Sequence, residues 1–214
     1  YSTIRRFMKE NGLLKQKVPG GRQRPGQIQA QKRFEGREIR SYEVEHVGAL
    51  WHLDFHHASR SVLTPDGRWV KPILLAVLDD YSRLCCHAQW YLEETTEVLV
   101  HGYSQAIQKR DLPRVTMTDN GSAMTSEEFT EGVERPGVTH ETTLPYSPYQ
   151  NAKQEVFFAS VEGRLMKMVK RIENLSLPFL NEATLAWVER EYNRTLHEEI
   201  KEPPLDRFLR GPDV

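Results

Sequence analysis

The sequence has little of several features that define common protein classes. Only two of its 214 residues are cysteines, Cys85 and Cys86. Because the two are adjacent, they exclude a disulfide scaffold and predict a protein of the reducing cytoplasm. No run of about 18 apolar residues occurs, so we expect neither a membrane span nor a membrane partner. An initiator methionine and a signal peptide are also lacking, and we expect the sequence to be a fragment of a longer protein.

Net charge is nearly absent as well, because 29 basic and 30 acidic side chains give a formal charge of −1. This balance conceals two parts of opposite sign. Residues 1–40 hold 11 Lys and Arg against 3 Glu, a net charge of +8, and the remaining residues carry −9. A basic segment of this kind is typical of chains that contact phosphates, so the near-neutral total does not exclude a nucleic-acid partner.

The chain divides into three regions. Residues 2–14 have a helical apolar pattern that ends at Asn11-Gly12. Residues 15–44 are basic, contain Gly and Pro and show almost no apolar periodicity, which predicts a linker or a weakly ordered arm. Two interpretations of this arm are open. It could be a solvated, flexible connection, or it could be a tether that contacts DNA phosphates through Arg22 and Arg24. Residues 45–210 have the patterns of a folded domain.

Within this domain the hydrophobic period changes along the chain. Strand-like runs are expected over residues 47–58, 69–79, 84–92, 114–118 and 138–144. Helices are expected over residues 95–110, 126–135, 149–172 and 181–199. Short turns join the first three strands, which predicts antiparallel pairing, whereas the later alternation of helix and strand favours parallel pairing. The sequence therefore predicts a mixed α/β domain with a C-terminal helical extension.

Three carboxylates stand out by their position. Asp54 lies inside the apolar first strand, where a carboxylate is costly to bury unless it is paired or binds a cation. Asp119 ends the fourth strand immediately before Asn120-Gly121, at a strand end where α/β sites form. Glu155 lies in the first turns of the helix expected over residues 149–172. We expect it at one side of that helix.

The two other faces of this helix are also predicted from an ideal helical period. Five residues are expected to form its apolar face: Phe158, Val161, Leu165, Met168 and Ile172. Four basic residues gather on the side away from Glu155: Lys153, Arg164, Lys167 and Arg171. We interpret Lys153, Arg164 and Lys167 as candidate DNA contacts.

Several motifs together resemble the catalytic core of DDE transposases and retroviral-type integrases. They are Trp-His-Leu-Asp at 51–54, Thr-Asp-Asn-Gly-Ser at 118–122 and Pro-Tyr-Ser-Pro-Tyr-Gln-Asn-Ala-Lys-Gln-Glu at 145–155. Between Asp119 and Glu155 lie 35 residues, which is the D,D-35-E spacing. The tail, with Tyr192-Asn193, His197 and Pro203-Pro204, resembles bacterial insertion-sequence transposases. Residues 1–14 resemble the end of the helix-turn-helix that precedes such cores.

This resemblance implies an RNase H-like fold, with a five-stranded mixed sheet flanked by helices. It implies that Asp54, Asp119 and Glu155 are catalytic and bind two Mg²⁺ or Mn²⁺ ions, which suits oxygen ligands and phosphodiester transfer. The implied activity is 3′-end cleavage of transposon DNA followed by strand transfer into target DNA. The implied protein is bacterial and cytoplasmic, forms a homo-oligomer on DNA and uses no nucleotide cofactor.

The sequence departs from the family in two places. Ala152 stands where the family usually has Gly, and we expect the fold to tolerate this small, helix-favouring residue. Ala159 and Glu162 stand where retroviral enzymes carry Lys. The basic residues that hold DNA are therefore inferred from helix geometry alone. Asn151 occupies the position of a DNA-contacting polar residue in integrases, and we assign it the same role.

Other interpretations of the same residues are open. His52, Asp54 and His56 alternate on one strand and could bind zinc, although strand alternation alone produces such sets and the two histidines could simply form hydrogen bonds. Asp79 and Asp80 offer an alternative carboxylate, but the family has a structural D-x-x-S-R turn here. The alternative functions are a catalytically silent, domesticated DNA-binding protein and an RNase H-like nuclease without strand transfer.

Overall fold

The computed structural model of the protein describes residues 43–143 and 152–212. Several predictions fall outside these residues: the helix over 2–14, all but the last two residues of the arm over 15–44, and the contacts at Arg22, Arg24 and Asn151. The strands are β1 (Leu50–His57), β2 (Val62–Leu63), β3 (Trp69–Val70), β4 (Ile73–Asp79), β5 (Cys85–Tyr91), β6 (Val115–Thr118) and β7 (Thr139–Thr142). The helical segments are α3 (Thr96–Arg110), α4 (Glu127–Glu134), α5 (Ala152–Ser160), η2 (Val161–Leu165), α6 (Met166–Met168), η3 (Val169–Arg171), α7 (Leu177–Arg190), η4 (Tyr192–Arg194) and α8 (Pro204–Arg210).

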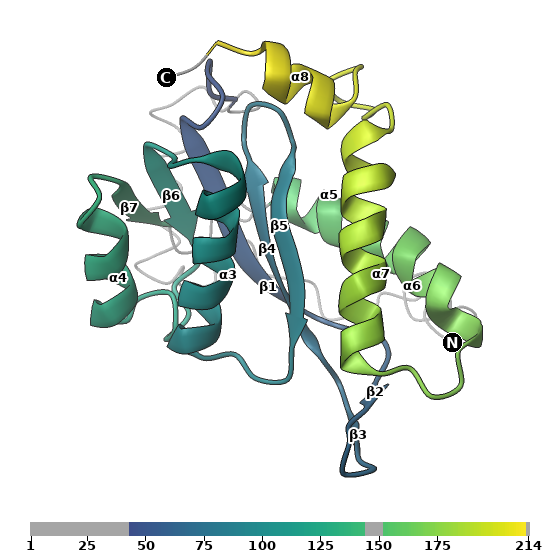
Figure 1. The fold of residues 1–214 in the computed structure, drawn as a ribbon. Coiled ribbons are helices and arrows are strands. Elements are labelled where there is room, and N and C mark those ends of the chain that lie inside the picture. The colour runs from purple at the N-terminus through teal and green to yellow at the C-terminus, as the bar shows by residue number, and fades with distance from the viewer. Residues whose placement is uncertain (1–42, 144–151, 213–214) are drawn as a thin grey trace, which may run out of the picture. The chain divides into compact units, whose positions relative to one another are not determined.

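Five strands form one mixed sheet in the order β5-β4-β1-β6-β7 (Figure 1). The pairs β1–β4 and β4–β5 are antiparallel, and the pairs β1–β6 and β6–β7 are parallel. The structure therefore confirms the three antiparallel strands and the change to parallel pairing that the element order predicted. Because β1 and β6 are parallel neighbours, their carboxyl ends meet at one edge of the sheet.

The strand β4, between β5 and β1, is buried along its whole length and separates two hydrophobic clusters. Successive side chains of a strand point to opposite faces, so neighbouring residues of β4 belong to different clusters. Ala76 packs with Phe157 of α5 and Trp187 of α7, whereas Val77 packs on the other face with residues of α3 and α4 such as Phe129. The sheet is therefore a middle layer with helices on both faces.

The strand predicted over residues 69–79 is interrupted. Trp69 and Val70 pair with β2 in a short hairpin around the predicted turn at residues 65–67, and β4 begins only at Ile73. Pro72 lies at the break, where it has no N–H to donate to a ladder and its carbonyl accepts the Ala58 amide at 3.0 Å. The proline therefore separates the hairpin from the central sheet.

The helix predicted over residues 149–172 is helical over its described part, but its apolar face differs from the prediction. Met168 is 64% exposed, and Met166 and Val169 are buried instead. The cause is η2, a π-helical turn with a wider hydrogen-bonded ring, which adds one residue to the turn. After η2 the inward position therefore moves one residue along the chain, from Met168 to Val169, while Leu165 stays buried and Met166 joins it in the core.

The C-terminal helices also differ in extent from the prediction. The helix expected over residues 181–199 begins at Leu177, because Ser176 caps it by accepting the Phe179 amide, and it ends at Arg190. The helix α8 was not predicted; it starts at Pro204, and proline suits the first turn of a helix. None of the helices within the described residues is long and apolar enough to cross a membrane.

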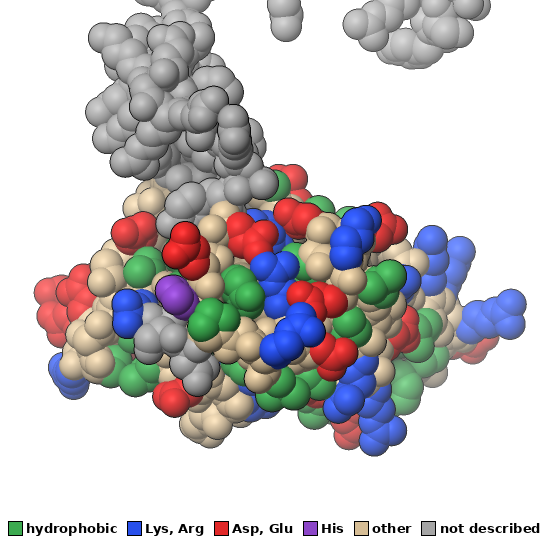
Figure 2. All heavy atoms as spheres, turned by 90° about the horizontal axis from the view of Figure 1, so that it is seen from above, with side chains coloured by type: hydrophobic (Ala, Val, Ile, Leu, Met, Phe, Trp, Pro, Cys, Tyr) green, Lys and Arg blue, Asp and Glu red, His purple; other side chains and the backbone are tan. Residues whose placement is uncertain are grey.

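The helix α8 lies on the face shown in Figure 2, where acidic and basic side chains are interspersed. Three ion pairs involve its arginines: Arg207 pairs with Glu43 and with Glu202, and Arg210 pairs with Glu202. The chain after α8 returns to the start of the domain, because the Val47 amide donates to the Pro212 carbonyl at 3.1 Å. The C-terminal extension is therefore part of the same folded unit as β1.

Candidate active site

Asp54 lies on β1 at the point where the strand emerges from the core. The four preceding residues of β1 are buried, and Asp54 is the first that is only partly buried. Its Oδ1 accepts the Phe55 amide at 2.8 Å. Burial, followed by repulsion from Asp119, raises the pKa of Asp54 to about 7, with smaller contributions from Glu94 and Glu155. Asp54 is therefore surrounded by other acidic groups.

Asp119 follows the last residue of β6 and lies beside Asp54. The parallel register pairs His52 with Met117, and two further residues along each strand are Asp54 and Asp119. The Asp119 carboxylate accepts the Gly121 amide at 2.9 Å, which fixes the turn after β6. A Cβ atom at Gly121 would lie 3.0 Å from Asp119 Oδ1, so the glycine allows this close approach.

Glu155 lies in the first turn of α5 and is exposed. Its charge contributes to the raised pKa of Asp54, so the helix brings it into the neighbourhood of the two aspartates. The described residues nevertheless contain no group of three or more His, Cys, Asp or Glu side chains arranged to hold a metal ion. The structure thus pairs Asp54 with Asp119 and brings Glu155 into electrostatic range without closing a three-carboxylate cluster.

The histidines of β1 bind carboxylates and do not form the zinc site considered as an alternative. His52 Nε2 lies 2.7 Å from Asp80 Oδ1, and His56 Nε2 lies 3.0 Å from Glu162 Oε1. The His56 ring also stacks on Phe158, with 4.8 Å between the ring centroids. Each histidine therefore has a carboxylate partner, in agreement with the interpretation that they form hydrogen bonds near the site.

Asp79 and Asp80 have separate roles in the turn between β4 and β5. Asp79 accepts the Gly48 amide at 2.8 Å and both the amide and the hydroxyl of Ser82 at 2.8 and 2.6 Å. This supports the interpretation of the D-x-x-S-R segment as a structural turn. Asp80 instead contacts His52, the Val44 amide and Lys153. Sequence reasoning did not assign these contacts, because no local pattern relates residues so far apart in the chain.

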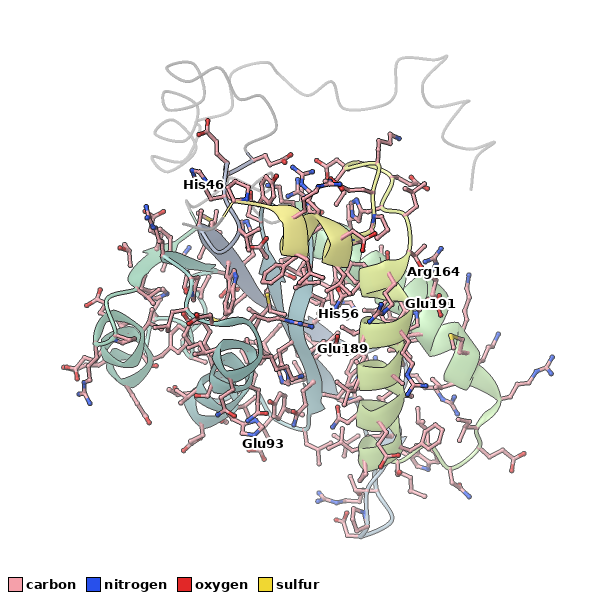
Figure 3. All side chains as sticks on the ribbon, turned by 45° about the horizontal axis from the view of Figure 1, so that its top comes forward. His46, His56, Glu93, Arg164, Glu189 and Glu191 are labelled. Carbon is pink, nitrogen blue, oxygen red and sulfur yellow. The ribbon has the colours of Figure 1, made fainter. Side chains whose placement is uncertain are left out.

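The candidate DNA-contacting residues fall into different environments. Lys153 is 15% exposed and pairs with Asp80. Arg164 Nη1 lies 3.9 Å from Oε1 of Glu191, the residue that follows α7 (Figure 3), and both side chains are about half exposed. Lys167 is exposed on α6. Of these three lysine and arginine side chains, Lys153 is thus the one held against the body of the domain.

Comparison with known proteins gives the class of this domain. The sequence model of the integrase core domain family matches residues 44–148. These residues include Asp54 and Asp119 and cover the whole central sheet. This part of the chain is similar to the integrase core domain family, which supports a DDE integrase or transposase core.

The solved structures with a similar fold include several from retroviruses. A chain in the cryo-EM structure of the simian T-cell lymphotropic virus intasome with the PP2A regulatory subunit B56γ matches with a TM-score of 0.67 and 18% identity, over 82% of this chain. The match covers 59% of that longer viral chain. The trimeric HTLV-2 integrase catalytic core in complex with magnesium matches with a TM-score of 0.57 and 21% identity, over 78% of this chain and 98% of the viral one.

The catalytic core of BIV integrase has a TM-score of 0.58 and 22% identity, over 76% of this chain and 94% of the viral one. These matches confirm the expected RNase H-like fold. No curated protein sequence matches the chain.

Proposed function

We propose that the chain is the catalytic core of a DDE transposase that cleaves the 3′ ends of its DNA and transfers them into target DNA. The observation that carries this proposal is the β1–β6 register, which places Asp54 within β1 beside Asp119 directly after β6, with Glu155 in electrostatic range. Three carboxylates from two strands and one helix are the donor set expected for metal-assisted phosphoryl transfer.

The residues fit a divalent cation. Burial and repulsion from Asp119 disfavour the ionised form of Asp54, and a bound cation would offset both effects. We propose that Asp54, Asp119 and Glu155 hold Mg²⁺ or Mn²⁺, as the magnesium complex of the HTLV-2 core supports. When bound, two such ions supply the activation of the attacking oxygen and the stabilisation of the leaving oxygen. The carboxylates themselves position the cations and form no covalent intermediate.

DNA is the proposed substrate and partner. Exposed basic side chains follow α5 on one helical segment: Arg164, Lys167, Lys170 and Arg171. Such a run suits the phosphate backbone, and we retain Asn151, Lys153, Arg22 and Arg24 as proposed contacts. Two DNA ends must be held together for joining, so we propose a homo-oligomer on DNA. The intasome and the dimeric and trimeric viral cores support this proposal.

Substitution of Asp119 tests the proposed activity. In the full chain, Asp119→Asn is expected to abolish Mg²⁺-dependent 3′-end cleavage and joining of labelled transposon-end DNA, while the affinity for that DNA stays within twofold of the wild type. Glu189→Gln serves as the control, because it alters a charge on α7 that pairs with Arg110 and leaves the carboxylates intact.

The reaction products distinguish the alternatives. Cleavage without joined products would indicate a nuclease, and metal-dependent binding without cleavage by the wild type would indicate a silent DNA-binding protein. Undiminished joining by Asp119→Asn would contradict the proposed role of the carboxylates.

A further inference from the structure

A closed circuit of contacts connects the strand that carries Asp54 with the helix that carries Glu155. His52 lies two residues before Asp54, and Lys153 and Gln154 immediately precede Glu155. The four members of the circuit are His52, Asp80, Lys153 and Gln154. Three of them are almost fully buried, and the side chain of Lys153 is 15% exposed. Each contact within the circuit bridges a different pair of structural elements.

Asp80 is the centre of this circuit. Its Oδ1 lies 2.7 Å from His52 Nε2 and also pairs with Lys153 Nζ, and its Oδ2 accepts the Val44 amide at 3.0 Å. Asp80 itself is only 1% exposed. A buried carboxylate is stabilised by such partners, and removal of one partner leaves an uncompensated charge. Asp80 therefore ties β1, the start of the domain and the first turn of α5 to the turn after β4.

Gln154 closes the circuit on the other side of Lys153. Its Nε2 donates to the His52 carbonyl at 2.8 Å and to the Ala76 carbonyl at 3.4 Å. The side chain of His52 thus contacts Asp80, and its backbone contacts Gln154. The first turn of α5 is consequently attached to β1 directly through Gln154 and indirectly through Lys153 and Asp80.

Electrostatics agree with this geometry. Burial acts to raise the pKa of Asp80, but hydrogen bonds and charge from His52 and Lys153 outweigh it and hold the pKa well below its usual range. Asp80 is therefore ionised at neutral pH. It attracts Lys153, which lies two residues before Glu155 on α5.

We propose that Asp80 is a positioning residue, which fixes Glu155 relative to Asp54 through its contacts with Lys153 and His52. Glu155 lies on a helix that no strand pairing fixes to the sheet, whereas Asp54 and Asp119 are aligned by the β1–β6 register. The Asp80 contacts add a constraint at the first turn of α5 to the hydrogen bonds that Gln154 makes with the sheet. This inference rests on the proposed function for its catalytic consequence, but the constraint on α5 is a property of the protein without metal or DNA.

The first experiment measures the constraint itself. Asp80→Asn in the full chain keeps the shape of the side chain and removes its charge. Hydrogen exchange without metal or DNA should become faster at residues 156–160 of α5, whose amides can bond within the helix, and should remain unchanged in α7. The control is Glu189→Gln, which breaks the Arg110–Glu189 pair between α3 and α7 and should leave exchange in α5 unchanged. If the hydrogen-exchange rates in α5 were the same in Asp80→Asn as in the wild type, the proposal would be overturned.

The second experiment measures the effect on the carboxylate site. The Mg²⁺ concentration for half-maximal joining should rise about 10-fold in Asp80→Asn, since removal of a group that orients metal ligands has an effect of this size. Lys153→Met should cause a similar rise, and the double variant should be little worse than either single one, because both remove the same interaction. Unchanged Mg²⁺ dependence with a lowered melting temperature would reduce Asp80 to a stabilising residue and overturn the proposal.

The variants also separate this role from direct DNA binding. If Lys153 acted only on phosphate, Lys153→Met would weaken DNA binding without changing the Mg²⁺ dependence, and Asp80→Asn would change neither. Absence of metal-dependent joining in the wild type would refute the proposed function, while the exchange measurement would still decide the constraint on α5.

Discussion

Asn193 binds the backbone of Cys85 through both ends of its side-chain amide. Its Oδ1 accepts the Cys85 amide at 3.0 Å, and its Nδ2 donates to the Cys85 carbonyl at 3.1 Å. The Asn193 side chain in η4 thus satisfies the backbone N–H and C=O of Cys85, which a neighbouring strand would otherwise satisfy. Tyr192 adds a bond from its hydroxyl to the Arg83 carbonyl at 3.2 Å. The Tyr-Asn motif of the tail therefore fastens the C-terminal extension to the start of β5.

Replacement of Asn193 by alanine should destabilise the domain strongly. Asn193 is fully buried, so Asn193→Ala leaves a buried N–H and a buried C=O of Cys85 without partners. We expect a loss of about 2–4 kcal/mol in the free energy of unfolding, measured by urea denaturation. Asn174→Ala, at an exposed position, is the matched control and should change this free energy by no more than about 0.5 kcal/mol. Equal losses in the two variants would contradict the anchoring role.

The sequence predicted those parts of the fold that depend on local patterns. The strands, the capped helix α3 and the turn after Asp119 follow from hydrophobic period, a Thr cap and an Asn-Gly pair, and the structure has all three. The π-helical turn η2 escaped prediction because an ideal period of 3.6 residues was assumed throughout. The prediction therefore placed Met168, and not Val169, in the core.

The candidate site shows the same division between local and distant information. Asp54 and Asp119 were selected by their place in strands, and the β1–β6 register brings them side by side. The proposed role of Asp80 depends on His52, which is 28 positions away in the chain, and on Lys153, which is 73 positions away. No periodicity relates such residues, so Asp80 was considered only as an alternative carboxylate or as part of a turn.

Two helical glycines should respond in opposite directions to alanine. Gly132 is exposed in α4, and a Cβ there would meet no atom within 4 Å. Because alanine restricts the unfolded chain and favours helix, Gly132→Ala should stabilise the domain by about 0.5–1 kcal/mol. Gly102 in α3 is the matched comparison, since its Cβ would overlap the buried side chain of Leu75, and Gly102→Ala should destabilise. Thermal denaturation of both variants measures the contrast, and a stabilising Gly102→Ala would contradict the packing described.

His87 should make the stability of the domain depend on pH. Burial, together with the positive charge of Lys109, whose Nζ lies 3.3 Å from His87 Nδ1, lowers the pKa of His87 to about 4. The unfolded chain protonates this histidine near its ordinary pKa of 6.5. The unfolded state therefore binds the proton first as the pH falls. The contribution of neutral His87 to the stability of the domain is therefore complete above about pH 6.5 and decreases as the pH falls to about 4.

A variant isolates this contribution. The decrease attributable to His87 should amount to about 2–3 kcal/mol between pH 7 and pH 4, and His87→Gln should remove it. The measurement is urea denaturation of both proteins at a series of pH values. The difference in unfolding free energy between them should be constant above pH 7 and should change below pH 6.5. A constant difference down to pH 4 would show that the folded protein protonates His87 as readily as the unfolded chain.

The exposed basic residues after α5 should contribute to DNA binding through phosphate contacts. Lys167 is exposed on α6, and replacement of one phosphate-contacting lysine lowers the magnitude of the slope of log K against log salt by about 0.9. We therefore expect Lys167→Gln to weaken binding of duplex DNA at low salt, with a reduced salt dependence and no preference among sequences. Fluorescence anisotropy at several salt concentrations measures both quantities. Arg135→Gln is the matched control, because Arg135 follows α4, which packs on the opposite face of the sheet from α6. An identical loss of slope in Arg135→Gln would attribute the effect to overall charge and would contradict a binding surface beside α5.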